Sequence, residues 1–135
     1  MFRLSRGVEY AIKGLIYFAS QPQDRVIPLS EISEAENIPK SFLVKLFQVL
    51  LKQRIVKSVR GLDGGFMLGK APHEISLLEV IEGIDGHLSS FYDCHDNNCS
   101  KSENKICPIC NIYREGIEKL SDVLKSHNIG EMATL

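Results

Sequence analysis

The most constraining feature of this sequence is an amphipathic helix pattern that runs directly into a glycine-rich hairpin pattern. Residues 40–53 form a wide apolar stripe at helical spacing, made of Phe42, Leu43, Leu46, Phe47, Leu50 and Leu51. Residues 55–60 alternate as a strand does, residues 61–65 (GLDGG) form a turn, and residues 66–68 supply the return strand. A helix with one apolar face that leads at once into a hairpin is compatible with few folds, and the surrounding elements decide which.

Two more helices precede this unit. Residues 5–20 carry apolar side chains at helical spacing, namely Val8, Ala11, Ile12, Leu15, Ile16 and Ala19. After a polar loop marked by prolines, residues 30–36 predict a short helix, and residues 37–38 form a tight turn. In this region we expect Ser30 as the N-cap, Ile32 and Ala35 facing inward, and Pro39 at the first position of the next helix.

The chain after the hairpin predicts two further helices. Ser76 and Glu79 form a capping box that opens the first of them, and Gly83 and Gly86 end it. The last helix is amphipathic and extends to about His127, with an apolar stripe of Ile112, Ile117, Leu120, Val123 and Leu124. The order of helix, short helix, turn, helix and hairpin predicts a mainly α fold with a small β-hairpin wing. This is a winged helix-turn-helix followed by a long C-terminal helix.

We expect three regions in the chain. Residues 1–86 form a winged helix-turn-helix DNA-binding domain, residues 87–110 a cysteine-rich cofactor loop, and residues 111–135 a dimerisation helix with the C-terminal tail. Glu9 and Lys13 interrupt the apolar N-terminal stretch, so it resembles neither a signal sequence nor a membrane span. We therefore expect a cytoplasmic protein.

Charge is distributed unevenly along the chain, although the formal net charge is only -1. Residues 37–62 contain no acidic residue and six basic ones: Lys40, Lys45, Lys52, Arg54, Lys57 and Arg60. Residues 74–99 contain six acidic residues and no Lys or Arg. This pattern is typical of a face that binds a polyanion on a body that repels polyanions elsewhere. Two solvated faces of opposite sign are the alternative that charge alone leaves open.

The basic helix and the hairpin together predict a site for double-stranded promoter DNA. On its polar face, where side chains can reach phosphates and base edges of the major groove, the helix carries Lys40, Ser41, Lys45 and Gln48. At the hairpin, Arg60 can enter the minor groove. Gly61 and Gly64 let the backbone of the tip approach DNA closely, since only Leu62 adds bulk there. The alternative is a core helix with a basic exposed face, followed by a solubilising turn.

A single winged module contacts too little of a duplex for tight, specific binding, so we expect a homodimer. The C-terminal helix is the candidate interface, because it follows a module that is already complete. Its apolar stripe can pair with its own copy across a two-fold axis. Packing only on its own domain is the alternative.

All four cysteines of the chain lie within residues 93–110, at the spacing C-x4-C-x7-C-x2-C: Cys94, Cys99, Cys107 and Cys110. In a cytosolic protein, clustered cysteines indicate metal binding or catalysis rather than disulfides. Four thiolates form a soft, tetrahedral set that suits zinc or an iron–sulfur cluster. His95 and His73 could substitute as ligands. Redox-active thiols without a metal are the alternative.

The residue patterns do not indicate an enzyme. The sequence has no Ser/His/Asp arrangement, phosphate-binding loop or paired-carboxylate pocket. Residues 107–110 (CPIC) lack the strand–helix–strand context of a thioredoxin-like redox site. An electron carrier would have no use for the basic helix and the wing, so we expect a regulator.

Four stretches of the chain together resemble the Rrf-two (Rrf2) family of winged-helix regulators: RLSRGVEYAIKGL, IPKSFLVKLFQVLLKQRIVKSVRGLDGGFMLGK, ISLLEVIEGIDG and the late cysteines. The resemblance implies a homodimeric transcriptional regulator, here a repressor. It implies sensing of redox state, nitric oxide or iron supply through a [2Fe-2S] or [4Fe-4S] cluster. A winged-helix regulator whose cysteines bind structural zinc or act as a thiol switch is the alternative.

The resemblance also implies a set of cluster ligands. The family's three cluster cysteines are matched by Cys94, Cys99 and Cys107. The fourth ligand is either Cys110, where some members place a histidine, or Glu9 from the first helix of the partner subunit, where other members place an acidic ligand. Members that use a C-x2-C pair with residues of the partner's first helix would leave Cys94 and Cys99 unliganded.

At the DNA-binding face, the resemblance assigns Arg60 to the minor groove and Ser41 and Lys45 to DNA contacts. The chain departs from the family pattern in three places. The first two intervals between cysteines are four and seven residues, where members usually have about five and five. Val44 and Lys45 stand where many members have a Glu-Gln pair, and the wing reads Leu-Asp where many read Pro-Gly.

Overall fold

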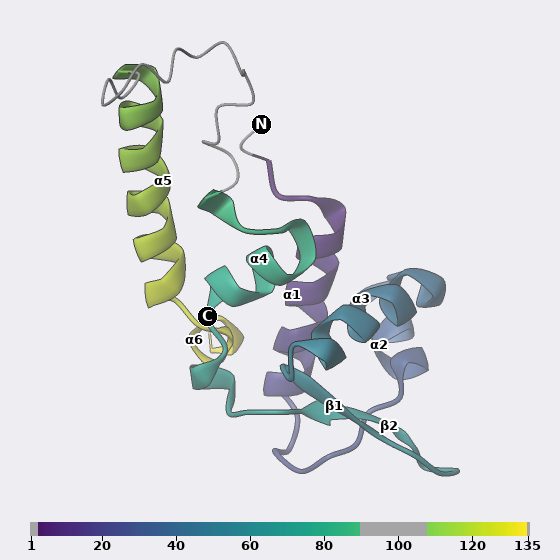
Figure 1. The fold of residues 1–135 in the computed structure, drawn as a ribbon. Helices are drawn as coiled ribbons and strands as arrows, with labels where there is room; N and C mark the ends of the chain where they lie inside the picture. Colours follow the sequence, from purple (N-terminus) through teal and green to yellow (C-terminus); the bar gives the residue numbers. More distant parts are fainter. Residues whose placement is uncertain (1–2, 90–107, 135) are drawn as a thin grey trace.

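The computed structural model describes residues 3–89 and 108–134 of the chain (Figure 1). These residues are mainly helical with one antiparallel two-stranded hairpin, as the sequence predicts. In chain order the elements are α1 (Arg6–Ala19), α2 (Leu29–Glu36), α3 (Lys40–Lys52), β1 (Val56–Val59), β2 (Gly65–Leu68), the 3-10 helix η1 (Pro72–Glu74), α4 (Leu77–Asp85), α5 (Pro108–Ser126) and α6 (Ile129–Ala133). No helix of this described part combines the length and the hydrophobicity that crossing a membrane requires.

Helix α1 is the centre of the hydrophobic core. The Ser5 side chain caps it by accepting a hydrogen bond from the Val8 N–H. Val8, Ala11 and Leu15 on its inner face are fully buried, and α1 packs against α2, α3, α4, α6 and β2. Because burying a large aliphatic side chain stabilises a fold by roughly 1.5–3 kcal/mol, this one face holds most of the described elements together.

Helix α2 begins one residue earlier than expected. Pro28 is its N-cap, so Ser30 is the second helical residue and the prediction of a Ser30 cap was wrong. The buried residues of α2 are Leu29 and Ile32, whereas Ala35 is exposed, which corrects the predicted inward face. The core contacts of α2 therefore come from its first turn and its middle, and not from its last turn.

Helix α3 begins at Lys40. Pro39 is its N-cap, with a ψ of 128° that is not helical, so the prediction of Pro39 as the first helical residue was wrong. The buried face of α3 consists of four residues of the predicted stripe, namely Leu43, Leu46, Phe47 and Leu50. The edges of the stripe are less covered: Phe42 is exposed, with its ring edge-on to Tyr10, and Leu51 is half-buried.

The hairpin is attached to the core at its base. Residues 56–59 and 65–68 pair in antiparallel register. Phe66 exchanges two backbone hydrogen bonds of 2.8 Å with Ile27, in the loop between α1 and α2, a pairing that the sequence did not indicate. The Phe66 ring lies against the Phe47 ring, with 5.3 Å between centroids. The wing and α3 therefore belong to one packed unit.

Helix α4 lies between α3 and α5 (Figure 1) and contacts both. The capping box of Ser76 and Glu79 at its start is confirmed, with both reciprocal hydrogen bonds present. The helix continues to Asp85 and Gly86 is its C-cap, so Gly83 lies inside the helix and its prediction as a helix end was wrong. A single glycine lowers helix propensity but does not by itself stop a packed helix.

The last helix, α6, was not predicted, and it folds back on α1 and η1. The Ile129 N–H donates to the Ile75 carbonyl at 3.0 Å, and the Leu77 N–H donates to the His127 carbonyl at 2.9 Å. Ile129 is fully buried. The end of the chain therefore contributes to the same core as the winged helix-turn-helix.

Candidate nucleic-acid interface

Helix α3 presents its predicted polar face to solvent. The exposed residues along it are Lys40, Ser41, Val44, Lys45 and Gln48. The opposite face is held by fully buried Leu43 and Phe47. Because the buried face fixes the rotation of the helix about its axis, the polar residues form one continuous surface directed away from the core.

The turn between α2 and α3 is closed by local hydrogen bonds. Asn37 adopts the left-handed conformation, with φ 53°. The Ser33 hydroxyl donates to the Ile38 carbonyl at 2.6 Å, and the Ile38 N–H donates to the Ser33 carbonyl at 3.1 Å. Asparagine tolerates this conformation well, which was a signal in the sequence, but the role of Ser33 had no such signal. Together these contacts set the angle at which α3 leaves α2.

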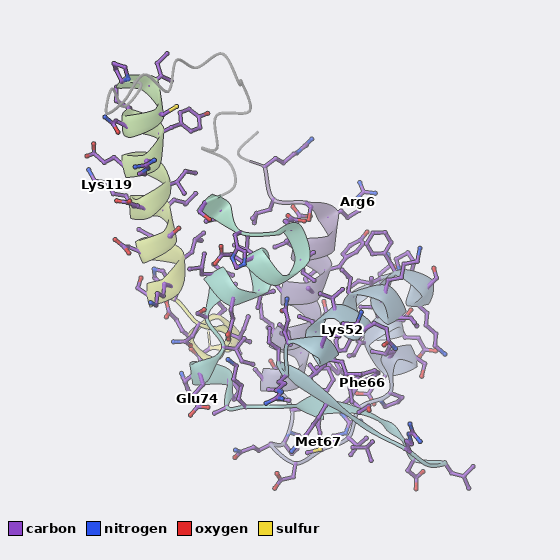
Figure 2. All side chains as sticks on the ribbon, in the orientation of Figure 1. Arg6, Lys52, Phe66, Met67, Glu74 and Lys119 are labelled. Carbon is purple, nitrogen blue, oxygen red and sulfur yellow. The ribbon has the colours of Figure 1, made fainter. Side chains whose placement is uncertain are left out.

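The basic residues of positions 37–62 are available to a polyanion. All six are exposed, and within residues 3–89 and 108–134 none of them forms an ion pair. Of the acidic residues in the 74–99 region, the four that the structure describes lie on η1 (Glu74) and on α4 (Glu79, Glu82 and Asp85), and Glu79 binds Lys70 at 2.8 Å. In Figure 2, the label Lys52 shows the basic region on α3, and the label Glu74 shows the acidic residue on η1. The described acidic residues of that region therefore lie on different elements from the six basic ones.

The wing tip is a tight turn built on glycine. Gly61 has φ 125°, a conformation that residues with a Cβ rarely adopt, and it accepts a 3.0 Å hydrogen bond from the Gly64 N–H. A Cβ on Gly65 would lie 2.4 Å from the Ile27 carbonyl oxygen, so only glycine permits the hairpin to sit this close to the loop. Arg60, at the end of β1, is exposed. The tip thus extends as a narrow element with Arg60 at its side.

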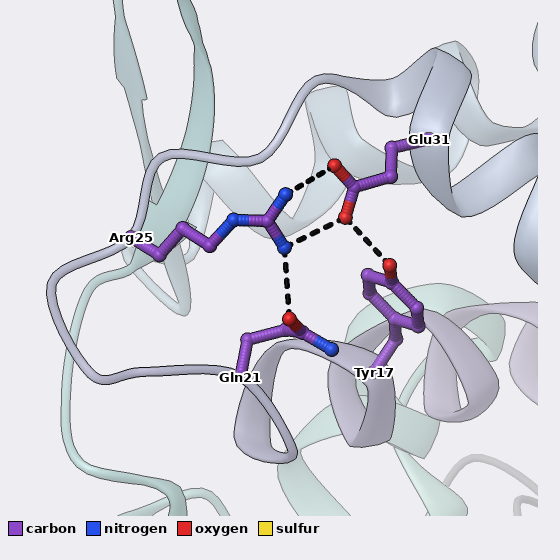
Figure 3. Close-up of polar contacts among 4 residues, drawn as sticks. All are labelled: Tyr17, Gln21, Arg25 and Glu31. Carbon is purple, nitrogen blue, oxygen red and sulfur yellow. Dashed lines mark hydrogen bonds and ion pairs between the residues drawn. The ribbon is translucent and has the colours of Figure 1, made fainter.

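Four polar residues hold α2 against α1 (Figure 3). The Arg25 guanidinium donates to both carboxylate oxygens of Glu31, at 2.8 and 2.5 Å, and to Gln21 at 2.8 Å. The Tyr17 hydroxyl donates to Glu31 at 2.5 Å. The hydrogen bond from Arg25, and then that from Tyr17, lowers the pKa of Glu31. The hydrogen bond to Glu31 raises the pKa of Tyr17.

Most of the predicted cofactor ligands, Cys94, His95, Cys99 and Cys107, lie outside the described residues. Cys110 is half-buried in the first turn of α5 and is disulfide-bonded. Glu9 is exposed in the first turn of α1. His73, on η1, has its ring against the backbone of Gly130. In the described ranges alone, no three His, Cys, Asp or Glu residues are grouped so that they could hold a metal ion.

Helix α5 carries two stripes, where the sequence predicts one. The stripe on the α4 side is buried or half-buried and consists of Cys110, Tyr113, Ile117, Ser121 and Leu124. The other stripe is exposed and consists of Ile109, Ile112, Gly116, Leu120 and Val123. Ile109 and Ile112 are 71% and 69% exposed. Ile117 and Leu124 therefore serve the core of their own chain, whereas the second stripe is not covered by any residue in the described part of the chain.

Known proteins resemble this chain over nearly its full length. The family model Rrf2, described as an iron-dependent transcriptional regulator, matches residues 4–134. The transcriptional regulator IscR of Pectobacterium carotovorum is 30% identical over 130 residues, which cover 96% of this chain and 78% of that protein. The fold is similar to that of CymR, the global cysteine regulator of B. subtilis, with a TM-score of 0.80, 22% identity and coverage of 99% and 98% of the two chains. The fold is also similar to that of T. potens IscR, with a TM-score of 0.79, 21% identity and coverage of 98% of this chain and 87% of that chain.

Replacing Glu31 by Gln tests the polar cluster through its pH dependence. Because the folded pKa of Glu31 is lowered, its carboxylate stabilises the fold above the ordinary pKa of 4.5, and this contribution is lost as the pH falls through the folded pKa. Thermal melts should therefore show a larger loss of stability between about pH 6 and about pH 3 for the wild type than for Glu31→Gln. Glu34→Gln, an exposed position of the same helix, should keep the wild-type pH dependence. Equal losses in wild type and Glu31→Gln would refute the role of the cluster.

Proposed function

The chain belongs to the Rrf2 family of transcriptional regulators, and we propose that it is a homodimeric repressor whose affinity for promoter DNA depends on an iron–sulfur cluster held by its late cysteines. Its relatives are regulators, and it is not an enzyme. The observation that carries the proposal is the basic, solvent-exposed face of α3, which lies beside a wing anchored to the same core.

The proposed DNA contacts divide between the two grooves. Helix α3 would enter the major groove, where Lys40 and Lys45 neutralise phosphates. Ser41 and Gln48 would reach base edges from the same face. The wing would lie over the adjacent minor groove, with Arg60 directed into it and Gly61 and Gly64 allowing the backbone to come close. The separation of acidic residues onto η1 and α4 supports this orientation, because the opposite one would bring carboxylates to the phosphates.

The exposed stripe of α5 supports a symmetric dimer because its spacing is palindromic. Its residues are separated by three, four, four and three positions, with Gly116 in the middle. In an antiparallel pair, Ile112 would meet the partner's Leu120, and Ile109 would meet the partner's Val123. Gly116 would lie at the crossing point of the two helices. In the single chain, a Cβ added to Gly116 would have no neighbour within 4 Å, so the chain itself does not require a glycine there. A surface that is complementary to its own copy favours a homodimer over an unrelated partner.

The donor set of the late cysteines fits a soft metal centre. Thiolates are the preferred ligands of iron–sulfur clusters and of structural zinc. We propose Cys94, Cys99 and Cys107 as ligands, with Cys110 or Glu9 of the partner subunit as the fourth. Cys110 lies in the first turn of α5, so it would connect the centre to the dimerisation helix. When bound, a cluster would supply a group that reacts with oxidants and nitric oxide.

The packing of α4 offers a route from the cysteine segment to the DNA-binding face. Residues 86–107 join α4 to α5, and α4 contacts α1, α3 and α5. The Ser5 hydroxyl donates to Asp85 at 2.7 Å, which ties the end of α4 to the start of α1. We propose residues 1–86 as the DNA-binding region, 87–110 as the sensing segment and 111–135 as the dimerisation region. A coupling of about 1–3 kcal/mol between segment conformation and DNA affinity would suffice for regulation.

A thiol switch is the second candidate function, and the disulfide at Cys110 favours it. A cysteine in a disulfide cannot act as a metal ligand, because the ligand form is the thiolate. Oxidation of Cys110 and its coordination of a cluster or zinc are therefore mutually exclusive states. Under this candidate, oxidation of Cys110 would itself be the signal.

DNA binding is tested by selecting duplexes from a random-sequence library with the purified dimer. We expect enrichment of a site with two half-sites related by two-fold symmetry. On that duplex, Lys45→Ala should weaken binding and lower the slope of log affinity against log salt concentration by about 1 for each phosphate that Lys45 neutralises. Lys119→Ala, on α5, is the control and should change neither quantity. Failure of the wild type to enrich any duplex would sink the proposal.

The dimer is tested by Ile112→Asp, which places one carboxylate from each subunit in the proposed interface. We expect the dissociation constant of the dimer, measured by analytical ultracentrifugation, to rise by about 100-fold or more, since a buried unpaired carboxylate is costly. Lys125→Asp introduces the same side chain at an exposed position on the opposite side of α5 from the exposed stripe, and it should leave the dimer intact. A dimer of unchanged affinity in Ile112→Asp would place the interface elsewhere.

The cofactor is tested by purification without oxygen, followed by iron, sulfide and zinc analysis and visible absorption. We expect a brown protein with charge-transfer bands and bound iron, and loss of both in Cys107→Ser. Loss of the bands in Cys110→Ser but not in Glu9→Gln would assign the fourth ligand to Cys110, and the reverse would assign it to Glu9. A colourless protein with stoichiometric zinc would exclude the cluster. A metal-free protein whose DNA affinity follows the redox state of Cys110 would establish the thiol switch.

A further inference from the structure

We infer that Leu62 is an apolar wedge that inserts against a base step in the minor groove of the operator, beside Arg60. The inference rests on the proposed DNA-binding function and adds a second contact residue to the wing. Leu62 would contact the stacked bases and deoxyribose faces that line the groove. This apolar surface is not covered by the guanidinium of Arg60.

Leu62 is the most exposed large apolar residue of the described part of the chain. Its relative exposure is 107%, and the next value is 71%, for Ile109. The exposed apolar residues of α5 have counterparts in the proposed dimer, but Leu62 lies at the tip of the hairpin, which projects from the body beyond α3 (Figure 1). Within residues 3–89 and 108–134 nothing covers it.

The turn itself does not require a leucine. The hydrogen bond from the Gly64 N–H to the Gly61 carbonyl makes Leu62 and Asp63 the two central residues of a four-residue turn. Such positions accept most residue types, and exposed turns usually carry polar ones. The positive φ of the turn falls on Gly61. In the free chain, Leu62 therefore contributes nothing that a smaller or polar side chain would not.

The wing presents Leu62 at a defined position relative to α3. The base of the hairpin is held by the backbone hydrogen bonds between Phe66 and Ile27 and by the packing of Phe66 on Phe47. Phe47 belongs to α3, so the wing tip and the proposed recognition face form one body. Because the base of the hairpin is already held, docking the tip requires little further ordering of its backbone, and the cost that remains is the rotamer freedom of the Leu62 side chain.

The charges at the wing tip do not account for a contact between the tip and DNA, so we assign that contact to the apolar side chain of Leu62. Residues 60–65 contain one base and one acid, Arg60 and Asp63, so the tip as a whole is not attracted to phosphates. The negative potential of the minor groove favours Arg60, and the phosphates at its rim repel Asp63. Leucine is among the side chains that unstack a base step from the minor groove, at a cost of a few kcal/mol that the new contacts must offset.

The test compares Leu62→Ala with the wild type on the duplex enriched by selection. With 2-aminopurine placed in turn at the base steps between and beside the half-sites, the wild type should raise its fluorescence at one step per half-site, and Leu62→Ala should not. Leu62→Ala should bind roughly 10-fold more weakly with an unchanged salt slope, because the substitution removes apolar area and no charge. Arg60→Ala should reduce both affinity and slope. Leu62→Met keeps an apolar side chain of similar size and should retain both wild-type signals.

The outcomes separate this inference from the function on which it rests. If the wild type binds the selected duplex and Leu62→Ala binds equally well, or binds more weakly without any difference in 2-aminopurine fluorescence, the wedge is refuted and the proposed function stands. If the wild type selects no duplex, the proposed function fails and the wedge fails with it. Because Leu62 has no contact with the core, thermal melts of Leu62→Ala should match those of the wild type.

Discussion

The packing of Phe47 against both α1 and the wing is the contact on which the rest of the structure depends. This side chain is fully buried, with ring centroids 5.8 Å from Phe18 of α1 and 5.3 Å from Phe66 of β2. It fixes the rotation of α3, so that Lys45 and its neighbours face outward, and it fixes the distance between α3 and the hairpin. Phe66 in turn is paired with Ile27. The candidate DNA-binding surface is therefore rigid because one core organises both of its parts.

Helix α4 links this rigid surface to the part of the chain that carries the cysteines. It contacts α1 and α3 on one side and α5 on the other (Figure 1), and residues 86–107 connect it to α5. Within the described part of residues 74–99, the acidic side chains lie on η1 and α4, whereas the six basic residues of the 37–62 region lie on or next to α3 and β1. A regulator built in this way would have its sensing segment, its dimer helix and its DNA-binding face meeting at a single helix.

Local signals in the sequence predicted the elements that local chemistry controls. The periodic stripe of α3, the alternating hairpin strands and the Ser76 capping box were confirmed, because each depends on residues a few positions apart. The predicted helix starts were wrong by one or two residues: Ser30 was expected as the N-cap of α2, where Pro28 is the N-cap, and Pro39 was expected as the first residue of α3, where it is the N-cap. Several residues can cap a helix start, and for α2 the burial of Leu29 chose between them. The Ile27–Phe66 pairing and the return of α6 had no local signal, because both join segments that are distant in sequence.

By itself the sequence determined the order of the main helices and of the hairpin up to α5, the basic face of α3 and the chemical type of the late cysteines. These follow from residue type and periodicity, which do not depend on neighbours elsewhere in the chain. Only the tertiary structure decided which apolar residues of α5 are covered: Ile117 packs on its own chain, while Ile112 and Val123 stay exposed. A helix with apolar residues on two sides has no preferred side until another element occupies one, and α4 occupies the side of Ile117.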